Sequence, residues 1–419
     1  MRRDLPRAEE GIAEVTVAVS QIIREISESP LSALRNHAER FDGVVPDSFR
    51  VSAKDLAKAL EETSAELRSA LTEAIERVRK VSQAGVPKGF TVSVAQDAVV
   101  EQRYQPVDSV GLYVPGGKAV YPSSVVMNAV AAQAAGVARI AICSPAQAEF
   151  GGLPHPSILA AAELLGVTEV YAIGGASAVA ALAYGVPEIG LEPVAMVTGP
   201  GNIYVATAKR LLRGVIGIDS EAGPTEILIL ADQRANPAFV AADLISQAEH
   251  DENAAAVLVT DSAELIEQVV RELEIQLPKT KNSERAGIAL AGVQSALVLV
   301  SSLDDAIAVA NAYATEHLEI MTSRDDEVVS KITNAGAIFV GPYSPVSLGD
   351  YLAGSNHVLP TGEQARFGPG LGVHSFLRPQ QLIRYGKSGL EAVTPSLRVL
   401  ADTEGLPAHG DAAEIRREN

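Results

Sequence analysis

The sequence predicts an α/β protein with two Rossmann-like open parallel-sheet domains, flanked by helical extensions at the N-terminal and C-terminal ends. After Gln105, short β-rich runs alternate with alanine-rich helical stretches, in the order VGLYVP, PSSVVMNAVAAQAAG, RIAICSP, PSILAAAELLG, EVYAIGG and PVAMVTGP. A second series of the same kind begins near Ile227, and its strands are ILILAD, AAVLVT, ALVLVS, HLEIMT and AIFVG. This alternation is typical of parallel, doubly wound sheets.

Helix signals surround and separate these strands. Between residues 52 and 84, apolar side chains recur every three or four positions, which predicts an amphipathic helix. Capping residues at Asn236, Ser262 and Ser302 mark the starts of helices in the second series. From Gly341 onward, a Gly- and Pro-rich loop precedes a short helical tail, and a loop of this length is more often functional than idle.

Composition narrows the kinds of partner. The 419 residues are 47% apolar, which is enough to bury more than one core. The formal charge of -18, with no cluster of Lys or Arg, disfavours nucleic acid and anionic membranes as partners. Aromatic residues make up 4% of the chain and Trp is absent, which disfavours a platform for stacking bases or sugars. A small, partly polar substrate fits this composition better.

The N-terminal residues and the cysteine content bear on location and metal chemistry. The start, MRRDLPRAEE, is charged where a secretory signal would be apolar, and no apolar run is long enough to span a membrane, so we expect a cytoplasmic protein. The single cysteine, Cys143, ends an apolar strand, and we expect a buried, inert thiol there. A metal site would therefore use His, carboxylate or amide ligands.

A polar pair ends one of the predicted helices. Gln247 and His250 lie three positions apart, so both side chains project from one face toward the following loop. They could form half of a metal site. The alternative is a polar helix end at which the neighbouring carboxylates are solvated and His250 interacts with the helix dipole.

A Glu-His pair lies where a predicted helix gives way to a strand. Glu316 and His317 follow Tyr313 at this junction, and we expect such junctions in an open sheet to face the crevice in which ligands bind. A pair of this kind suits proton transfer. The alternative is a histidine at a strand edge that is simply exposed to water.

The long loop and the tail carry further candidates. Asp350 and His357 lie in GDYLAGSNHVLPT, where glycines let the backbone approach a ligand closely. Asp350 is a plausible metal ligand and His357 an orienting or binding group, although Asp350 could equally cap a turn. His409, in LPAHGD near the C-terminus, is a surface residue as judged from its local sequence.

A Gly-rich turn offers an anion site. In TGPGNIYVATAKR, Gly199 and Gly201 lie between a predicted strand and a helix, where backbone N–H groups and the helix dipole favour a phosphate. Tyr204 takes the place of the third glycine in the usual dinucleotide fingerprint. Any nucleotide site here therefore departs from the usual Rossmann geometry.

Longer motifs in the chain resemble those of the histidinol dehydrogenase family. These motifs run from roughly residue 20 to about residue 410 in the family's order, and their sequences are most similar to those of actinobacterial members. They are VGLYVPGG, CSP, GGA, TGPGN, AGPTE, DLISQAEHD, EHLEI, NAGAIFVG, GDYLAGSNHVLPTG and LPAH. The resemblance implies an NAD-dependent enzyme with one zinc ion per subunit, which oxidises L-histidinol to L-histidine at the end of histidine biosynthesis.

The resemblance implies a zinc and substrate site. Zinc would be held by one amide, one carboxylate and two imidazole side chains: Gln247, His250, Asp350 and His409. The substrate would contact these four residues and three more: Thr225, His317 and Glu404. His357 matches a further position near the substrate. An amide oxygen is an unusual zinc ligand, so Gln247 is the least expected member on chemical grounds.

The resemblance also implies catalytic and cofactor contacts. His317 would take the alcohol proton as hydride leaves for NAD, and Glu316 would activate water for the second oxidation. NAD would contact Tyr113, Ser177 and Asn202. The family usually has Gln where this chain has Ser177, and because Ser is shorter, a hydrogen bond to NAD could be lost or replaced by water.

Four regions follow from the patterns and the resemblance together. We expect a mainly helical region over residues 1–110 that packs on the second α/β domain, and a Rossmann-like domain with NAD-contacting loops over 111–224. A second such domain, over 225–370, would carry the zinc and acid/base residues. The last region, 371–419, would reach the neighbouring subunit of a homodimer, so that Glu404 and His409 would complete the partner's site.

Two alternatives stand beside this interpretation. One is a related zinc and NAD dehydrogenase of another small alcohol, such as a sulfonated diol. Glu404 and His409 argue against it, since they suit a cationic substrate with an imidazole ring. The other is a zinc-binding or nucleotide-binding protein that has lost turnover, against which the retained Glu316 and His317 argue.

Overall fold

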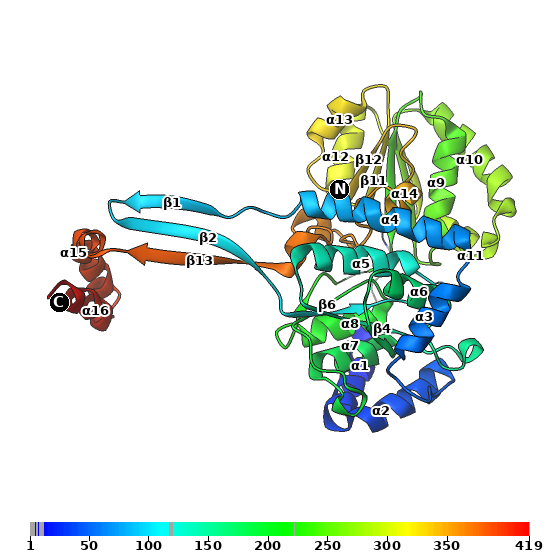
Figure 1. The fold of residues 1–419 in the computed structure, drawn as a ribbon. Helices are drawn as coiled ribbons and strands as arrows, with labels where there is room; N and C mark the ends of the chain where they lie inside the picture. The colour runs from blue at the N-terminus through cyan, green and yellow to red at the C-terminus, as the bar shows by residue number, and fades with distance from the viewer. Residues whose placement is uncertain (1–4, 6, 8–11, 117–119, 222, 419) are drawn as a thin grey trace.

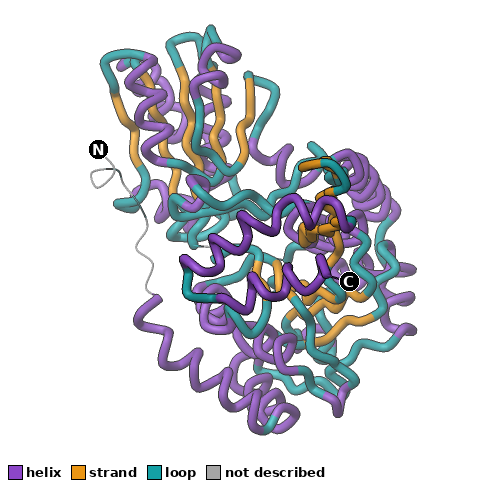
Figure 2. The backbone as a smooth tube through the Cα atoms, turned by 90° about the vertical axis from the view of Figure 1, so that its left-hand side faces the viewer, coloured by secondary structure: helices purple, strands orange, loops and turns teal. Residues whose placement is uncertain are grey.

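Two lobes and a projecting arm make up the molecule. Each lobe is built around a five-stranded parallel sheet, and the thin arm extends away from both (Figure 1). Seen from the side of the arm, the two sheets occupy separate lobes, one above the other (Figure 2). The prediction of two open parallel-sheet domains with helical flanks is confirmed. This computed structural model describes the chain except for residues 1–4, 6, 8–11, 117–119, 222 and 419.

The first lobe holds the sheet of order β5-β4-β3-β6-β7. Its strands are β3 (Ser109–Tyr113), β4 (Arg139–Ser144), β5 (Glu169–Ala172), β6 (Met196–Thr198) and β7 (Gly217–Ile218). Its helices are α5 (Pro122–Ala135), α6 (Pro156–Leu164), α7 (Gly175–Tyr184) and α8 (Ile203–Leu212). Helix α5 is buried on nearly all sides, because β3 covers one face and helix α4 another. Its sequence accordingly lacks a polar stripe.

The second lobe repeats this arrangement with the order β10-β9-β8-β11-β12, so both sheets read 3-2-1-4-5 along the chain. Its strands are β8 (Glu226–Ala231), β9 (Ala255–Thr260), β10 (Ala296–Leu299), β11 (His317–Met321) and β12 (Ala337–Val340). Its helices are α9 (Pro237–Ala248), α10 (Ala263–Gln276), α11 (Ser283–Ala291), α12 (Leu303–Tyr313), α13 (Asp325–Lys331) and α14 (Val346–Tyr351). The predicted caps Asn236, Ser262 and Ser302 each accept a backbone N–H at the start of a helix.

The N-terminal helices cover the first lobe. They are α1 (Ile12–Glu28), α2 (Pro30–His37), a π-helical turn (Ala38–Asp42), α3 (Ala53–Glu62) and α4 (Ala65–Ala84). The single helix predicted over 52–84 is two helices, because the Ser64 side chain accepts the N–H of Leu67 and starts α4 anew.

The expected packing of this N-terminal region on the second domain is wrong. Helix α1 packs against α7 and α8, α3 against α6, and α4 against α5, all in the first lobe. The reason is that the apolar faces of these helices join the two cores of the first lobe. The segment before α1 contacts the second lobe: Leu5 packs on the core of that lobe, and Arg7 forms an ion pair with Glu226.

The arm is an antiparallel ribbon that the sequence reading missed. It consists of β1 (Phe90–Ala95), β2 (Ala98–Pro106) and β13 (Leu377–Tyr385), in the order β1-β2-β13. Helices α15 (Lys387–Thr403) and α16 (Pro407–Glu418) form a pair at its tip (Figure 1). The ribbon is thin and solvated on both sides, so its apolar side chains have little to pack on: Phe90 is 52% and Ile383 69% exposed.

The loop after α14 returns to the first lobe. Val358, Leu371 and Phe376 are buried in the core that also contains α4 and α5. In addition, the side chain of Asn356 donates to the carbonyl of Met127 in α5 at 2.8 Å. The last part of the expected 225–370 domain is therefore a strap between the lobes, held by apolar burial against the first one.

Cys143 at the end of β4 is fully buried, and burial raises the pKa of its thiol well above its usual range. The expectation of a buried, inert thiol is therefore confirmed. Among the helices of the described residues, none combines the length and the apolar character needed to cross a bilayer.

A buried ion pair shapes the Gly-rich turn between β6 and α8. Lys209 and Asp219 form this pair, and both side chains are almost fully buried. Lys209 Nζ donates to the carbonyl of Gly199 at 3.0 Å, and Asp219 Oδ2 accepts from the N–H of Gly199 at 2.8 Å. Gly199 has a φ of +117°, and a Cβ there would lie 2.1 Å from the carbonyl oxygen of Tyr113. The turn thus requires glycine and is clamped on both sides of that residue.

Lys209→Met should destabilise the protein strongly. We expect the free energy of unfolding to fall by roughly 3–5 kcal/mol, because Asp219 would be left as an uncompensated buried charge. Denaturation in urea, followed by circular dichroism, measures the loss. The double variant Lys209→Met/Asp219→Leu should recover part of it. As a control, Arg77→Met breaks the exposed pair with Glu73 and should cost less than about 1 kcal/mol. A loss that small in the Lys209 variant would contradict the clamp.

Candidate active site

A hydrogen-bonded carboxylate lies at the start of two neighbouring strands. Glu316, just before β11, accepts at Oε2 from Thr225 Oγ1 at 2.5 Å and from the backbone N–H of Glu226 at 3.0 Å. Burial raises the pKa of Glu316 to about 7, an effect that these hydrogen bonds and the charge of His250 oppose. At neutral pH the carboxyl therefore exchanges a proton readily, as an acid/base residue must.

His317 presents one ring nitrogen to the site. Its Nδ1 lies 3.2 Å from the carbonyl oxygen of Glu226 and donates to it, which leaves Nε2 as a proton acceptor. Burial lowers the pKa of His317, although the charge of Asp350 opposes this, so the ring is neutral at pH 7. A neutral imidazole with a free nitrogen is a competent general base.

This pair lies at a different edge of the sheet from the one expected. His317 is the first residue of β11 and pairs in register with Ile227, near the start of β8. It therefore occupies the amino edge, whereas the usual ligand crevice of an open sheet lies outside the carboxyl ends. The correction has a simple cause: a chain that passes from a helix into a strand enters the strand at its amino end.

Gln247, in the last turn of α9, is tied to the same carboxylate. Its Nε2 donates to Thr225 Oγ1 at 2.5 Å. The single hydroxyl hydrogen of Thr225 is already given to Glu316, so Thr225 can only accept from the amide, and the amide orientation is fixed. The carbonyl oxygen Oε1 of Gln247 is buried and has no hydrogen-bond partner among the described residues. Such an orphaned oxygen indicates a ligand.

The side chains of His250 and Asp350 join this cluster. His250 Nδ1 donates to the carbonyl of Ser246 at 3.0 Å, which leaves its Nε2 free for a metal. Asp350, near the end of α14, has its backbone carbonyl bound by His357 Nδ1 at 2.9 Å. Helix α14, which carries Asp350, packs against α9, which carries Gln247, and the charges of His250 and Asp350 both act on the Glu316 carboxyl.

His357 connects the two lobes. While its Nδ1 holds the Asp350 backbone, its Nε2 lies 3.1 Å from Ser124 Oγ, at the start of α5 in the first lobe. Both ring nitrogens are thus occupied, and burial lowers the pKa of the ring. The arrangement fits an orienting role for His357 rather than that of a free proton carrier.

The donor set fits zinc but is incomplete within one chain. Gln247 Oε1 and His250 Nε2 are unpaired donors of types that zinc accepts, and Asp350 is a carboxylate on α14, which packs against α9. Over the ranges that the structure describes, no three His, Cys, Asp or Glu side chains gather closely enough to hold a metal ion. His409, in α16, and Glu404, directly after α15, are both exposed, and these two helices lie at the arm tip, away from the lobes (Figure 1). The fold of a single chain therefore does not bring them to this cluster.

The expected NAD contacts gather at the carboxyl edge of the first sheet. Tyr113 ends β3, and its hydroxyl accepts the N–H of Gly175, at the start of α7, at 3.2 Å. Asn202 caps α8, with Oδ1 accepting the N–H of Tyr204 at 3.0 Å and leaving its amide nitrogen for a ligand. This is the edge at which nucleotides bind in open α/β sheets.

Ser177 is less available for a ligand than expected. Its hydroxyl lies 2.9 Å from His37 Nδ1, in the buried space between α7 and α2, and His37 Nε2 contacts Glu25 at 2.7 Å. Ser177 itself is 4% exposed. The short side chain is thus satisfied inside the protein, and an NAD contact would have to compete with His37.

The two edges face each other across the strap. Ser124 lies where α5 leaves the carboxyl edge of the first sheet, and it contacts His357 beside the Asp350 turn of the second lobe. The N–H of Gly223, close to Thr225, is bound by Thr361 of the same strap at 2.6 Å. Contacts of the strap thus connect the amino edge of the second sheet with the start of α5 at the carboxyl edge of the first.

Sequence reasoning missed Glu226. Its backbone orients both Glu316 and His317, and its carboxylate pairs with Arg7 at 3.0 Å and accepts the N–H of Gly362 at 2.7 Å. Burial raises the pKa of Glu226 to about 7, with Arg7 opposing. A charged residue at the head of the apolar run ILILA was the available signal.

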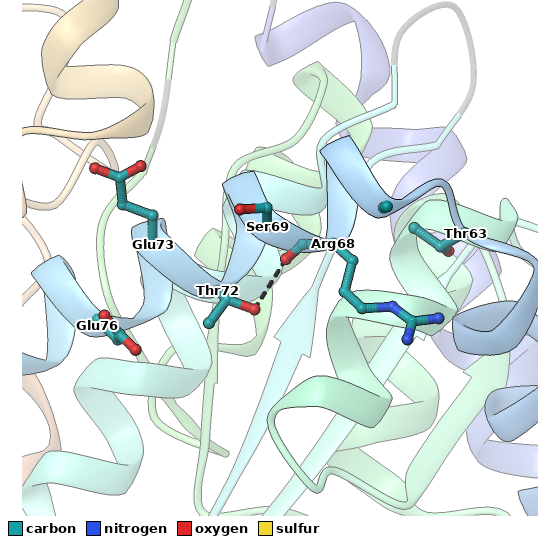
Figure 3. A pocket seen from close by; sticks show the side chains of 7 residues that line it. Thr63, Arg68, Ser69, Thr72, Glu73 and Glu76 are labelled. Atoms are coloured by element: carbon teal, nitrogen blue, oxygen red, sulfur yellow. Dashed lines mark hydrogen bonds between the residues drawn. The ribbon is translucent and has the colours of Figure 1, made fainter.

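A hollow on the outer surface does not overlap this site. It has a volume of about 530 Å³ and lies along α4 (Figure 3). Its lining residues are Thr63, Ala65, Arg68, Ser69, Thr72, Glu73 and Glu76, and none of them belongs to the cluster described above. The Thr72 hydroxyl donates back to the carbonyl of Arg68 at 2.8 Å, so part of its polar lining is already satisfied.

Comparisons with known proteins show the family of this chain. A family model described as histidinol dehydrogenase matches residues 5–417. The histidinol dehydrogenase of Leifsonia xyli subsp. xyli is 57% identical over 416 residues, covering 99% of this chain and 95% of the relative. That of Thermobifida fusca is 56% identical over 415 residues, covering 99% and 94%.

A solved structure gives the same answer. The crystal structure of histidinol dehydrogenase from Elizabethkingia anophelis matches with a TM-score of 0.95 and 32% identity, over 100% of this chain and 95% of that chain. The alternative of a dehydrogenase for another small alcohol finds no support in these relatives. With matches that run through both lobes and the arm, the chain belongs to the histidinol dehydrogenase family of oxidoreductases.

Proposed function

We propose that this protein oxidises L-histidinol to L-histidine in two successive NAD-dependent steps, the last steps of histidine biosynthesis, and retains L-histidinal between them. The observation that carries the proposal is the hydrogen-bonded chain from Gln247 through Thr225 to Glu316, which joins an orphaned ligand oxygen to an acid/base pair. The name shared by the family and the relatives supports the same reaction. Dependence on a diffusible NAD pool favours the cytoplasm as its location.

Four residues would hold zinc: Gln247, His250, Asp350 and a neighbouring subunit's His409. Zinc held there would supply a Lewis acid that orients the substrate. Thr225 bridges the Gln247 amide and the Glu316 carboxylate, and so connects this binding region to the acid/base pair. The substrate would therefore meet the acid/base pair in one orientation.

His317 would act as the base in both oxidations. Its free Nε2 accepts the hydroxyl proton of histidinol while the carbinol C–H leaves as hydride to NAD, which gives the aldehyde and NADH. The hydrogen bond from Nδ1 to the Glu226 carbonyl keeps the ring in the tautomer that this step needs. The lowered pKa of His317 keeps the ring unprotonated before the reaction.

Glu316 would activate water for the second oxidation. Its carboxylate takes a proton from water as the water oxygen adds to the aldehyde carbon, and protonated His317 returns the proton of the first step to the carbonyl oxygen, which forms the hydrate and restores the His317 base. His317 then takes a hydroxyl proton of the hydrate while hydride passes to a second NAD, and the carboxylic acid that results loses its remaining proton to solvent to give the carboxylate product. Retaining the aldehyde between the two lobes protects it from side reactions.

The arm would complete the site of a second subunit in a homodimer. Its exposed apolar side chains need a surface to cover them, as large exposed apolar areas usually do. Glu404 and His409 at its tip would then reach a neighbour's cluster, with Glu404 facing the cationic amino group of the substrate. This arrangement accounts for an incomplete ligand set beside an arm that contacts nothing in its own chain's site.

The yield of NADH per L-histidinol distinguishes the two proton-transfer roles. We expect about two NADH from the wild type, about one from Glu316→Gln and none from His317→Asn, because Glu316 serves the aldehyde step and His317 both steps. Absorbance at limiting substrate measures the yield, and a zinc chelator should abolish it in the wild type. Zinc content should stay unchanged in both variants. Equal loss of both oxidations in the Glu316 variant would count against the division of roles.

Mixing two inactive variants tests the shared site. His317→Asn disables the lobe and His409→Asn disables the arm, so one site of each mixed dimer carries both changes and the other none. Random mixing should therefore restore about a quarter of the wild-type rate. The matched control mixes His317→Asn with His250→Asn, which both lie in the lobe, and should restore nothing. Failure of the first mixture would show that each arm serves its own chain.

A further inference from the structure

A carboxylate outside the expected site residues lies at the nucleotide edge of the first sheet. Asp42 ends the π-helical turn that follows α2, and it is partly buried. Its Oδ1 comes within 3.1 Å of the position that a Cβ on Gly174 would take, and the ring of Pro145 comes equally close. Gly174 follows β5 and Pro145 follows β4, so Asp42 sits against the carboxyl ends of both strands.

Asp42 also lies near Tyr113, the last residue of β3. The Tyr113 hydroxyl accepts the N–H of Gly175, the residue after Gly174, at 3.2 Å, which places the Asp42 carboxylate near that phenol. Burial raises the pKa of Tyr113 to about 12, and the charge of Asp42 adds to this shift. The ends of three adjacent strands thus meet around one acidic side chain. Because β3 is the first strand of the 3-2-1-4-5 order and β4 the second, Asp42 lies on the side of the sheet away from the switch point between β3 and β6.

This is the place of the ribose-binding acid in open dinucleotide-binding sheets. In those folds an Asp or Glu beyond the second strand binds the hydroxyls of the adenosine ribose. Here the chain after β4 reads Pro145, Ala146 and Gln147, with no acid. Asp42 brings a carboxylate to the same place from an N-terminal element. We propose that Asp42 binds the adenosine ribose diol of NAD and thereby excludes NADP.

The state of Asp42 in the free protein supports a ligand role. No hydrogen bond or ion pair joins its carboxylate to another residue in the described part of the chain, and burial alone raises its pKa to about 6. An unpaired, partly buried carboxylate opposes folding, whereas two vicinal hydroxyls would satisfy both of its oxygens. A 2′-phosphate in their place would set two anions against each other, which gives the preference for NAD a physical cause.

The inference rests on the proposed use of NAD, but binding without any alcohol substrate tests it separately. Isothermal titration of the full-length protein with NAD and with NADP should show Asp42→Asn weakening NAD binding on the order of tenfold or more, because a charge-assisted hydrogen bond is lost. The same variant should bind NADP no more weakly than the wild type. Asp42→Glu keeps the charge and should still reject NADP.

Two controls make the result specific. Glu39→Gln removes an exposed charge from the same π-helical turn and should change neither affinity. With the wild-type protein, 2′-deoxy-NAD should bind about tenfold less tightly than NAD, a result that needs no variant to fold. The proposal is overturned if Asp42→Asn leaves the NAD to NADP affinity ratio within about twofold of the wild type, or if 2′-deoxy-NAD binds as tightly as NAD. Loss of histidinol oxidation with these affinities intact would instead count against the proposed function.

Discussion

The hydroxyl of Thr225 is the interaction on which the site depends. It donates to the Glu316 carboxylate and accepts from the Gln247 amide, so one side chain ties the end of α9 to the heads of β8 and β11. Because a hydroxyl has a single hydrogen, the direction of both hydrogen bonds is determined, and the carbonyl oxygen of Gln247 must point away from Thr225. The hydrogen bond on one side of the amide thus leaves the oxygen on its other side without a partner, which supports the proposal that this oxygen is a metal ligand.

The two lobes divide the chemistry by presenting opposite edges of similar sheets. The first offers its carboxyl edge, where helix starts and the clamped Gly199 turn suit a nucleotide. The second offers its amino edge, where Glu316 and His317 enter β11. His357 and the strap around it hold these edges together through Ser124. A repeated fold thus produces one site instead of two nucleotide sites.

Local pattern was enough to predict much of the fold but little of its assembly. Alternation of strands and helices, and caps such as Asn236 and Ser302, predicted both sheets, since these signals act over a few residues. The ribbon was missed because β13 pairs with β2, a strand very distant in sequence, as between Leu377 and Pro106, and no local signal records such a pairing. The packing of the N-terminal helices was wrong for the same reason.

Some residues of the candidate site could be predicted from the sequence, and others could not. Chemical type and helix position made Gln247, His250 and Glu316 candidates, but only the resemblance to a family pointed to His409, which is exposed in its own chain. Glu226 and Asp42 were not found, because their roles depend on contacts of the backbone and on neighbours distant in sequence. Ser177 was found by its position, yet its hydroxyl binds His37, which a sequence cannot show.

Zinc anomalous diffraction from crystals of the zinc-loaded protein tests most directly whether the buried, unpaired Gln247 Oε1 binds the metal. We expect one zinc ion per subunit, with Gln247 Oε1 at about 2.0–2.2 Å and with His250, Asp350 and a neighbouring subunit's His409 as its other protein ligands. Zinc bound elsewhere, or bound at this cluster without the Gln247 oxygen, would contradict the assignment of that oxygen as a metal ligand.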